Sequence, residues 1–315
     1  MLFRSQAIKF IEPEDGLNAA RLNITETLIW IKKLINKIEP DVVIVFNFFY
    51  GAIVCLSLIG SGIPVYVSDR QSPVFRWPKQ VSLFNKMVYS LCTPAGLIAQ
   101  TELAAEKQHA FFKQRTRIRV IPNGLKEAIL YPEIKRHKQI LAVGRLNDYQ
   151  KGFDRLIEAF AKIRDKDWQL VFAGGDEEGE QLKKQALELN VFERVIFLGK
   201  VKDIDRIYAE AGIFVIPSRS EGFPNALCEA MAAGLPCISF DFSAGPRDLI
   251  ISGENGMIIP NGDISSLASA IDYLISEPTE RERLGRKAME ISHKLDADKI
   301  ANQWLDFLHI LPAQT

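Results

Sequence analysis

Short apolar runs alternate with helix-length segments along nearly the whole chain. The runs that read as strands are 41–46, 63–67, 97–100, 118–121, 139–143, 169–173, 195–198, 213–216 and 236–240. The segments that read as helices are 22–38, 82–91, 102–112, 153–164, 177–189, 226–233, 264–275 and 298–308. Strands that alternate with helices form parallel sheets covered by helices, so the predicted fold class is α/β.

A polar, turn-rich stretch at 125–138 interrupts this alternation, and we expect it to join two domains. We place an N-terminal Rossmann-like domain at 1–133, a C-terminal one at 134–297 and a last helical segment at 298–315, which can dock on either domain. Residues 9–11 form at most one short strand, and no glycine precedes Gly16. Because a complete nucleotide-binding half begins with a strand, a glycine-rich turn and a helix, we expect the N-terminal domain to lack its first βα unit.

Composition excludes several classes of protein. Lys and Arg together number 39, as do Asp and Glu, and this balance argues against a nucleic-acid binder. No apolar run is long enough to span a bilayer, and the first residues lack the apolar core of a signal peptide. The four cysteines lack metal-ligand spacing, and the D-x-D pairs at 165–167 and 296–298 read as a surface turn and a helix cap. We therefore expect a cytoplasmic protein that needs no metal and no cofactor.

The most specific pattern lies at 220–234, where a buried strand is followed by a glycine-proline loop and a helix. Glu221 lies in that loop, and Glu229 lies on the first turns of the helix. In an open α/β sheet, ligands bind in the crevice outside the carboxyl ends of the strands. Amides at a helix N-terminus bind phosphate, and nearby carboxylates suit sugar hydroxyls. The combination fits a nucleotide-sugar.

Three further loops follow predicted strands. Arg145 and Lys151 project from one loop beside a helix N-terminus, where two cations suit a diphosphate; the alternative is a solvated surface pair. Gly174 ends a strand, where a missing Cβ lets a ligand approach the backbone, although a tight turn explains it equally well. The loop at Lys200 has a backbone suited to reading a base edge, or is an ordinary βα loop.

Asp69 and Arg70 follow strand 63–67 and are expected to face the second domain across the cleft. Arg70 suits leaving-group charge or an acceptor phosphate, and Asp69 suits an acceptor hydroxyl. The alternative is a local Asp–Arg pair. Arg247 either lines the crevice or pairs with Asp248.

The stretch 70–92 mixes basic with aromatic and other apolar residues. Its basic members are Arg70, Arg76, Lys79 and Lys86, and its apolar members include Phe75, Trp77, Phe84, Met87 and Tyr89. Such a stretch can lie on an anionic membrane surface, or it can simply be a helix that packs on its own domain.

These motifs together resemble glycosyltransferase family 4, of the GT-B fold, from residue 40 to the end. The residues that carry the resemblance are Gly144-Arg145-Leu146, Lys151-Gly152, 217–223, 229–234 and Asn255-Gly256. Ser68-Asp69-Arg70 with Gln100-Thr101-Glu102 is similar to the bacterial branch that acts on polyprenyl-diphosphate-linked sugars. That branch more often has Ser-Glu-Arg, and family members usually carry a His in this loop.

The resemblance implies two Rossmann-like domains facing a cleft. It also implies retaining, metal-independent transfer of a hexose or N-acetylhexosamine from a UDP-sugar to a glycan or lipid-linked acceptor in cell-surface polysaccharide assembly. By this resemblance Arg145 and Lys151 hold the diphosphate, Glu229 the ribose and Glu221 the donor sugar. The other donor-binding residues that it implies are Gly174, Lys200, Gly222, Phe223, Pro224, Asn225 and Leu227, and the expected catalytic residues are Glu221, Arg145, Lys151 and Arg70.

Two alternatives stay open. One is a truncated chain or accessory subunit that binds a nucleotide without turnover. The other is a nucleotide-sugar epimerase of the same fold, whose proton chemistry needs carboxylates and histidines in the cleft.

Overall fold

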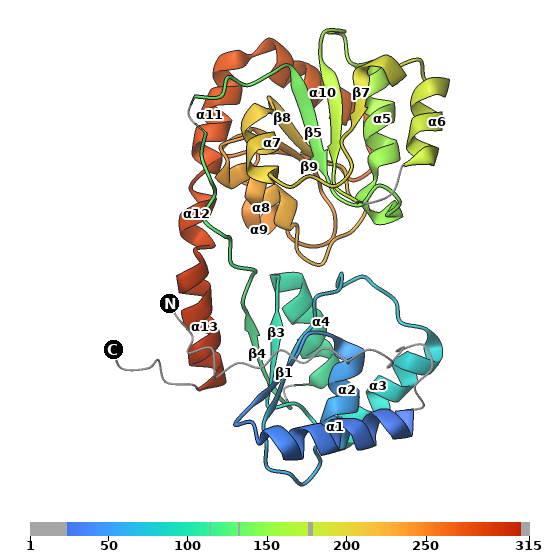
Figure 1. The fold of residues 1–315 in the computed structure, drawn as a ribbon, viewed down its shortest axis with the longest axis vertical. Coiled ribbons are helices and arrows are strands. Elements are labelled where there is room, and N and C mark those ends of the chain that lie inside the picture. The colour runs from blue at the N-terminus through green and yellow to red at the C-terminus, as the bar shows by residue number, and fades with distance from the viewer. Residues whose placement is uncertain (1–23, 114, 132, 176–178, 310–315) are drawn as a thin grey trace.

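The computed structural model describes residues 24–113, 115–131, 133–175 and 179–309, which form two lobes around two parallel sheets (Figure 1). The first sheet has the order β1-β2-β3-β4, with β1 (Val43–Val45), β2 (Val65–Ser68), β3 (Gly96–Ala99) and β4 (Arg117–Val120). The second has the order β10-β9-β8-β5-β6-β7, with β5 (Gln139–Val143), β6 (Gln169–Ala173), β7 (Val195–Phe197), β8 (Ile213–Ile216), β9 (Cys237–Phe240) and β10 (Met257–Ile259). All pairs of neighbouring strands are parallel, which confirms the predicted α/β class with two parallel sheets.

Helices fill the connections. They are α1 (Ile24–Ile38), α2 (Phe48–Ser57), α3 (Lys79–Leu91), α4 (Glu102–Phe112), α5 (Phe153–Lys162), α6 (Glu180–Glu188), α7 (Ile204–Glu210), α8 (Asn225–Ala232), α9 (Pro246–Leu249), α10 (Ile264–Ser276), α11 (Pro278–Ala288), α12 (Ile291–Lys294) and α13 (Ala297–Leu308). Strands β5, β6 and β8 and helix α4 have the predicted bounds. The strand expected at 9–11 lies outside the described residues.

Helix α2 is one element that the hydrophobic pattern did not predict. It carries no charged residue and buries residues on several sides, so it has no amphipathic period. Its start is set locally, because Oδ1 of Asn47 accepts hydrogen bonds from the backbone N–H groups of Phe49 and Tyr50 at 2.9 and 3.1 Å. The elements α7, α9, α11, α12 and β10 were not predicted either.

The first sheet is covered on both faces by different parts of the chain. Alternate strand residues point to opposite faces, so Val65 and Val67 pack with α1–α4 while Tyr66 packs on the other side. That other side receives α13, whose Phe307 ring lies 5.6 Å from the Tyr66 ring. The chain therefore returns at its end to complete the core of the first lobe.

Two crossings connect the lobes and lie side by side. The backbone N–H of Leu125, on the outgoing segment, donates to the carbonyl of Leu295, just before α13, at 2.7 Å. Figure 1 shows α11, α12 and α13 descending along one flank from the second lobe to the first.

The order of the second sheet reverses beside β5. Strands β6 and β7 extend the sheet on one side of β5, whereas β8, β9 and β10 extend it on the other. The loops that follow β5 and β8 diverge at such a point and leave a crevice, which is where open α/β sheets bind ligands. Arg145 follows β5 and Glu221 follows β8, so the topology brings these two segments together.

Candidate functional site

A cavity of about 490 Å³ lies between the lobes at this reversal point. Its second-lobe wall consists of Arg145, Asp148, Gln150, Lys151, Ser220, Glu221 and Gly222. Its first-lobe wall consists of Gln71, Ser72, Val74, Phe75 and Arg76. Four residues predicted as donor ligands thus share one cavity: Arg145, Lys151, Glu221 and Gly222.

The two second-lobe loops are held against each other by close packing. Gly152 has a φ of +66°, and a Cβ on it would lie 2.1 Å from the carbonyl oxygen of Pro217, so only glycine fits there. Both terminal nitrogens of Arg219 donate to the carboxylate of Asp154, and the guanidinium lies 3.8 Å from the centroid of the Tyr149 ring. The loop that carries Lys151 is thereby fixed on the loop that carries Glu221.

Lys151 and Glu221 form an ion pair at the centre of the site. Nζ of Lys151 donates to Oε1 of Glu221 at 2.9 Å, and the side chains are 22% and 12% exposed. Oγ of Ser218, which is fully buried, donates to the same carboxylate oxygen at 2.7 Å. The carboxylate therefore has defined partners, and the ammonium is held at the cavity wall.

Arg145 is more exposed than Lys151. Its guanidinium donates to Oδ2 of Asp148 at 2.8 Å while its side chain stays 75% exposed. Asp148 in turn accepts a hydrogen bond from the backbone N–H of Gln150. This bond caps the short helical turn Tyr149–Lys151, which carries Lys151. The same cavity wall thus carries one cation in a mostly buried ion pair and a second cation whose side chain is largely exposed.

Glu229 lies on α8, which begins directly after the loop containing Glu221. Its Oε2 accepts a hydrogen bond from the hydroxyl of the fully buried Tyr208 at 2.9 Å. Pro224 precedes α8 and supplies no capping side chain. Phe223 and Pro224 in this loop and Leu227 on α8 are buried, and the N–H of Leu227 donates to the Pro224 carbonyl. A direct contact of Leu227 with a ligand stays a prediction.

Glycines bring three neighbouring strand ends close together. Gly174 has a φ of +110°, and an added Cβ would lie 2.9 Å from the carbonyl oxygen of Gly144. The Gly174 N–H donates to the Gly199 carbonyl at 2.7 Å, and Lys200 follows Gly199 on the surface. Gly174 therefore serves close backbone packing of the loops, and roles of Gly174 and Lys200 in binding stay predictions.

Arg70 is not among the residues that line the cavity. Its guanidinium lies 5.0 Å from the Phe46 ring and 5.7 Å from the ring of Trp304 on α13, and it donates to the amide oxygen of Asn123. Nδ2 of Asn123 donates across to Oδ1 of Asn225, the first residue of α8, at 2.8 Å. Arg70 thus contributes to the seam between the lobes, and its expected part in catalysis stays a prediction.

The alternative of a local Asp69–Arg70 pair is not formed, because the carboxylate of Asp69 accepts from the backbone N–H of Gln71 at 3.2 Å. Burial raises the pKa of Asp69 to about 6. Arg247 pairs with Asp241, which directly follows β9. The alternative that Arg247 pairs with Asp248 was therefore wrong.

The first-lobe wall of the cavity is the part that sequence reasoning missed. Ser72 meets Ser220 across the lobes through their hydroxyl groups, and a Cβ on Gly222 would lie 2.2 Å from the carbonyl oxygen of Arg70. A usable signal existed, because 71–76 come shortly after the predicted strand 63–67, whose carboxyl end is expected to face the second domain. It was passed over because the stretch was interpreted through its basic and apolar composition.

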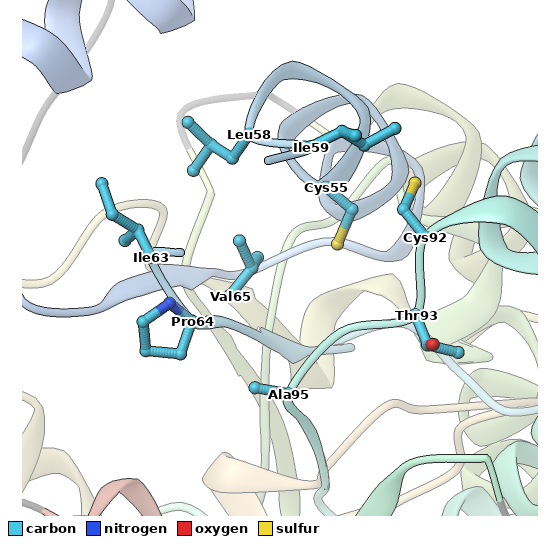
Figure 2. Close-up of a pocket in the computed structure, with 9 residues that line it drawn as sticks. All are labelled: Cys55, Leu58, Ile59, Ile63, Pro64, Val65, Cys92, Thr93 and Ala95. Carbon is cyan, nitrogen blue, oxygen red and sulfur yellow. The ribbon is translucent and has the colours of Figure 1, made fainter. Parts of the chain in front are cut away.

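A second cavity, of about 240 Å³, lies at the opposite end of the first sheet. Figure 2 shows that mostly apolar residues line it, together with the thiols of Cys55 and Cys92. Burial raises the pKa of Cys55 to about 12, so this group stays a neutral thiol. The cavity contains no charged side chain that could hold a phosphate.

The D-x-D pairs have the structural roles that were predicted. Asp296 caps α13 by accepting from the Lys299 N–H at 2.9 Å, and Asp165 accepts from the Asp167 N–H in a turn. Among the described residues, no group of three or more His, Cys, Asp or Glu side chains could hold a metal ion. In the same part of the chain, no helix is long and apolar enough to cross a membrane.

Comparison with known proteins connects this geometry to a family. An uncharacterized glycosyltransferase of Haemophilus influenzae is 29% identical over 284 residues, covering 88% of this chain and 79% of that protein. A Campylobacter jejuni α-1,4-N-acetyl-D-galactosaminyltransferase that acts on an undecaprenol-diphosphate-linked saccharide is 21% identical over 282 residues, covering 88% of this chain and 77% of that protein. The crystal structure of Anabaena HepE in complex with UDP superposes with a TM-score of 0.78 at 19% identity, covering 91% of this chain and 82% of that one.

The two parallel-sheet lobes are consistent with the GT-B fold of glycosyltransferases, as expected from the sequence. The family model for glycosyl transferases group 1 matches residues 131–291, just over half of the 315-residue chain. The match spans Arg145, Lys151, Glu221 and Glu229, so the chain belongs to the glycosyl transferases of group 1 and is a glycosyltransferase.

Proposed function

We propose that this glycosyltransferase moves a hexose or N-acetylhexosamine from a UDP-sugar to a glycan or lipid-linked saccharide, with retention of the anomeric configuration. The observation that carries the proposal is the position of the Lys151–Glu221 pair and Arg145. All three line one cavity between the lobes, at the reversal point of the second sheet.

The charges suit the reaction. Negative charge builds up on the departing diphosphate as the sugar becomes oxocarbenium-like, and cations held in advance near that charge stabilise the transition state. Lys151 and Arg145 supply two such cations from the second-lobe wall of the cavity. The carboxylate of Glu221, kept in place by Lys151 and Ser218, is available to accept hydrogen bonds from sugar hydroxyls.

In the proposed step, the bond from sugar C1 to the diphosphate oxygen breaks, and a bond from C1 to the acceptor hydroxyl oxygen forms on the same face. The proton of the acceptor hydroxyl passes to the departing diphosphate. Glu229 is proposed to accept from the ribose hydroxyls, with its orientation set by Tyr208. No protein nucleophile and no metal ion enters this scheme.

Similar proteins support the choice of donor and acceptor. HepE of Anabaena has been solved with UDP and with UDP and glucose, and the Campylobacter relative is named for an undecaprenol-linked acceptor. An Escherichia coli lipopolysaccharide 1,6-galactosyltransferase is also among the relatives. These relatives fit a role in polysaccharide or lipid-linked glycan assembly.

The test is turnover with a panel of UDP-hexoses and UDP-N-acetylhexosamines, read as UDP release and as the anomeric configuration of the product by NMR. Arg145→Ala should lower UDP release by about 10²-fold. Arg164→Ala is a matched control, because Arg164 is a similarly exposed arginine that pairs with Asp272 outside the cavity, and this variant should turn over as the wild type does. Inverted product, or equal turnover in both variants, would contradict the proposal.

A further inference from the structure

One segment of the first lobe differs in charge from the rest of this electrically balanced chain. Between Asp69 and Glu102 there is no acidic residue, whereas four basic residues occur there: Arg70, Arg76, Lys79 and Lys86. Arg70 packs within the seam between the lobes, whereas Arg76, Lys79 and Lys86 are exposed. The outer surface of this segment is therefore positively charged.

The same segment exposes large apolar side chains. Val74 is 39% exposed and Phe75 is 50% exposed in the loop before α3, while Leu83, Met87 and Leu91 on α3 are 69%, 55% and 73% exposed. Residues at i, i+4 and i+8 of a helix lie on one side, so the three α3 side chains form a single apolar stripe. Lys79 and Lys86 lie on the same helix and are also exposed.

The apolar stripe is not part of the hydrophobic core of the first lobe, because α3 packs on that core through a different side of the helix. That side buries Val88 and Tyr89 against α2, and the Tyr89 hydroxyl donates to the Phe48 carbonyl at 2.7 Å. The outward stripe consequently has no partner within the described part of the chain. We call Lys79, Leu83, Lys86, Met87 and Leu91 the α3 face.

The first-lobe residues that line the cavity lie just before α3 in the sequence. Val74, Phe75 and Arg76 line the cavity, and α3 begins three residues later. In Figure 1 the connection from β2 passes along the side of the first lobe that faces the second, and then leads away to α3. The loop that forms the first-lobe wall of the cavity therefore leads directly into α3.

We infer that the α3 face docks on an anionic lipid bilayer and that the acceptor is a saccharide linked through phosphate to a lipid that stays in that bilayer. An apolar stripe flanked by lysines, without acidic residues, is complementary to acyl chains below anionic headgroups. Arg76, at the cavity wall, is placed to contact the phosphate of such an acceptor as it enters. The docking stands on its own observations, and the identity of the acceptor rests on the proposed function.

The test uses the full chain in sedimentation with phosphatidylcholine vesicles, with and without phosphatidylglycerol. The wild type should bind the vesicles that contain phosphatidylglycerol, and binding should weaken as salt rises. Lys79→Glu with Lys86→Glu should weaken binding by at least about tenfold, because each basic residue near such a surface contributes about fivefold. Leu83→Gln with Met87→Gln should also weaken it. UDP binding should stay at the wild-type level in both variants.

Leu187→Gln with Lys162→Glu is the matched control, since it changes an exposed leucine and an exposed lysine on the second lobe. This control should sediment as the wild type does. Equal loss in the control, or unchanged vesicle binding in the α3 variants, would overturn the docking inference, as would a wild type that ignores phosphatidylglycerol. If the wild type binds the anionic vesicles but turns over no UDP-sugar, only the proposed function and the proposed acceptor are refuted.

Discussion

Replacing Lys151 by alanine should affect stability and donor binding through separable causes. In the native structure its ammonium lies 2.9 Å from Oε1 of Glu221, which is only 12% exposed. Hydrogen bonds to charged groups contribute about 1.5–3 kcal/mol, and a partly buried carboxylate left with one partner loses most of that amount. We therefore expect Lys151→Ala to lower the free energy of unfolding by about 1.5–3 kcal/mol.

Donor binding should fall for a different reason. Lys151 is proposed to face the diphosphate, so its loss should weaken UDP affinity by at least about tenfold and lower turnover by about 10²–10³-fold. The double variant Lys151→Ala with Glu221→Gln separates the two effects. The neutral amide can still accept from Ser218 but leaves no unpaired charge, so most of the stability should return while UDP affinity stays low.

Urea unfolding and calorimetry with UDP on the wild type, both single variants and the double variant provide the measurement. Wild-type UDP affinity in the double variant would show that Lys151 acts only by neutralising Glu221, which would refute the diphosphate assignment. Unchanged stability in Lys151→Ala would refute the account of the ion pair.

Three further outcomes are expected. Glu229→Gln should weaken binding of UDP itself, whereas Glu221→Gln should spare UDP binding and lower turnover, and calorimetry that shows equal losses would contradict this division between ribose and sugar. Transfer should survive EDTA, because Arg145 and Lys151 supply the positive charge; loss of transfer that Mg²⁺ or Mn²⁺ restores would refute it. Burial raises the pKa of Asp69 from 3.8 to about 6, so its contribution to stability is present below pH 4 and is lost as the pH rises through 6. Asp69→Asn should therefore gain stability relative to the wild type between pH 4 and 7, by on the order of 2 kcal/mol, and a pH-independent difference in urea unfolding would show that burial does not act in this way.

Much of the framework was predictable because its signals are local. The strands β5, β6 and β8 are apolar runs between turn residues, and their bounds were predicted correctly. Arg145 and Glu221 follow two of these strands directly, and parallel strands place such loops on one edge of a sheet. Local order along the chain was therefore enough to predict that the two segments meet.

Other features depended on tertiary packing. Helix α2 is apolar on all sides, so nothing in its period separates it from a buried strand. The surroundings of Arg70 are one example, because Phe46 and Trp304, the latter more than 230 positions away, both lie beside its guanidinium. Contacts between residues so distant in sequence leave no periodic signal.

The sequence by itself determined the α/β class and the loops at the strand ends that carry charge, because short-range pattern and turn chemistry specify strands, helices and the loops between them. Only the tertiary structure decided that Lys151 pairs with Glu221, that Asp69 and Arg70 do not pair, and that 71–76 form the first-lobe wall of the cavity. Those outcomes follow from the order of strands in the second sheet and from the packing of two lobes. Both depend on the burial of apolar surface summed over the whole chain, and no single segment of the sequence carries that information.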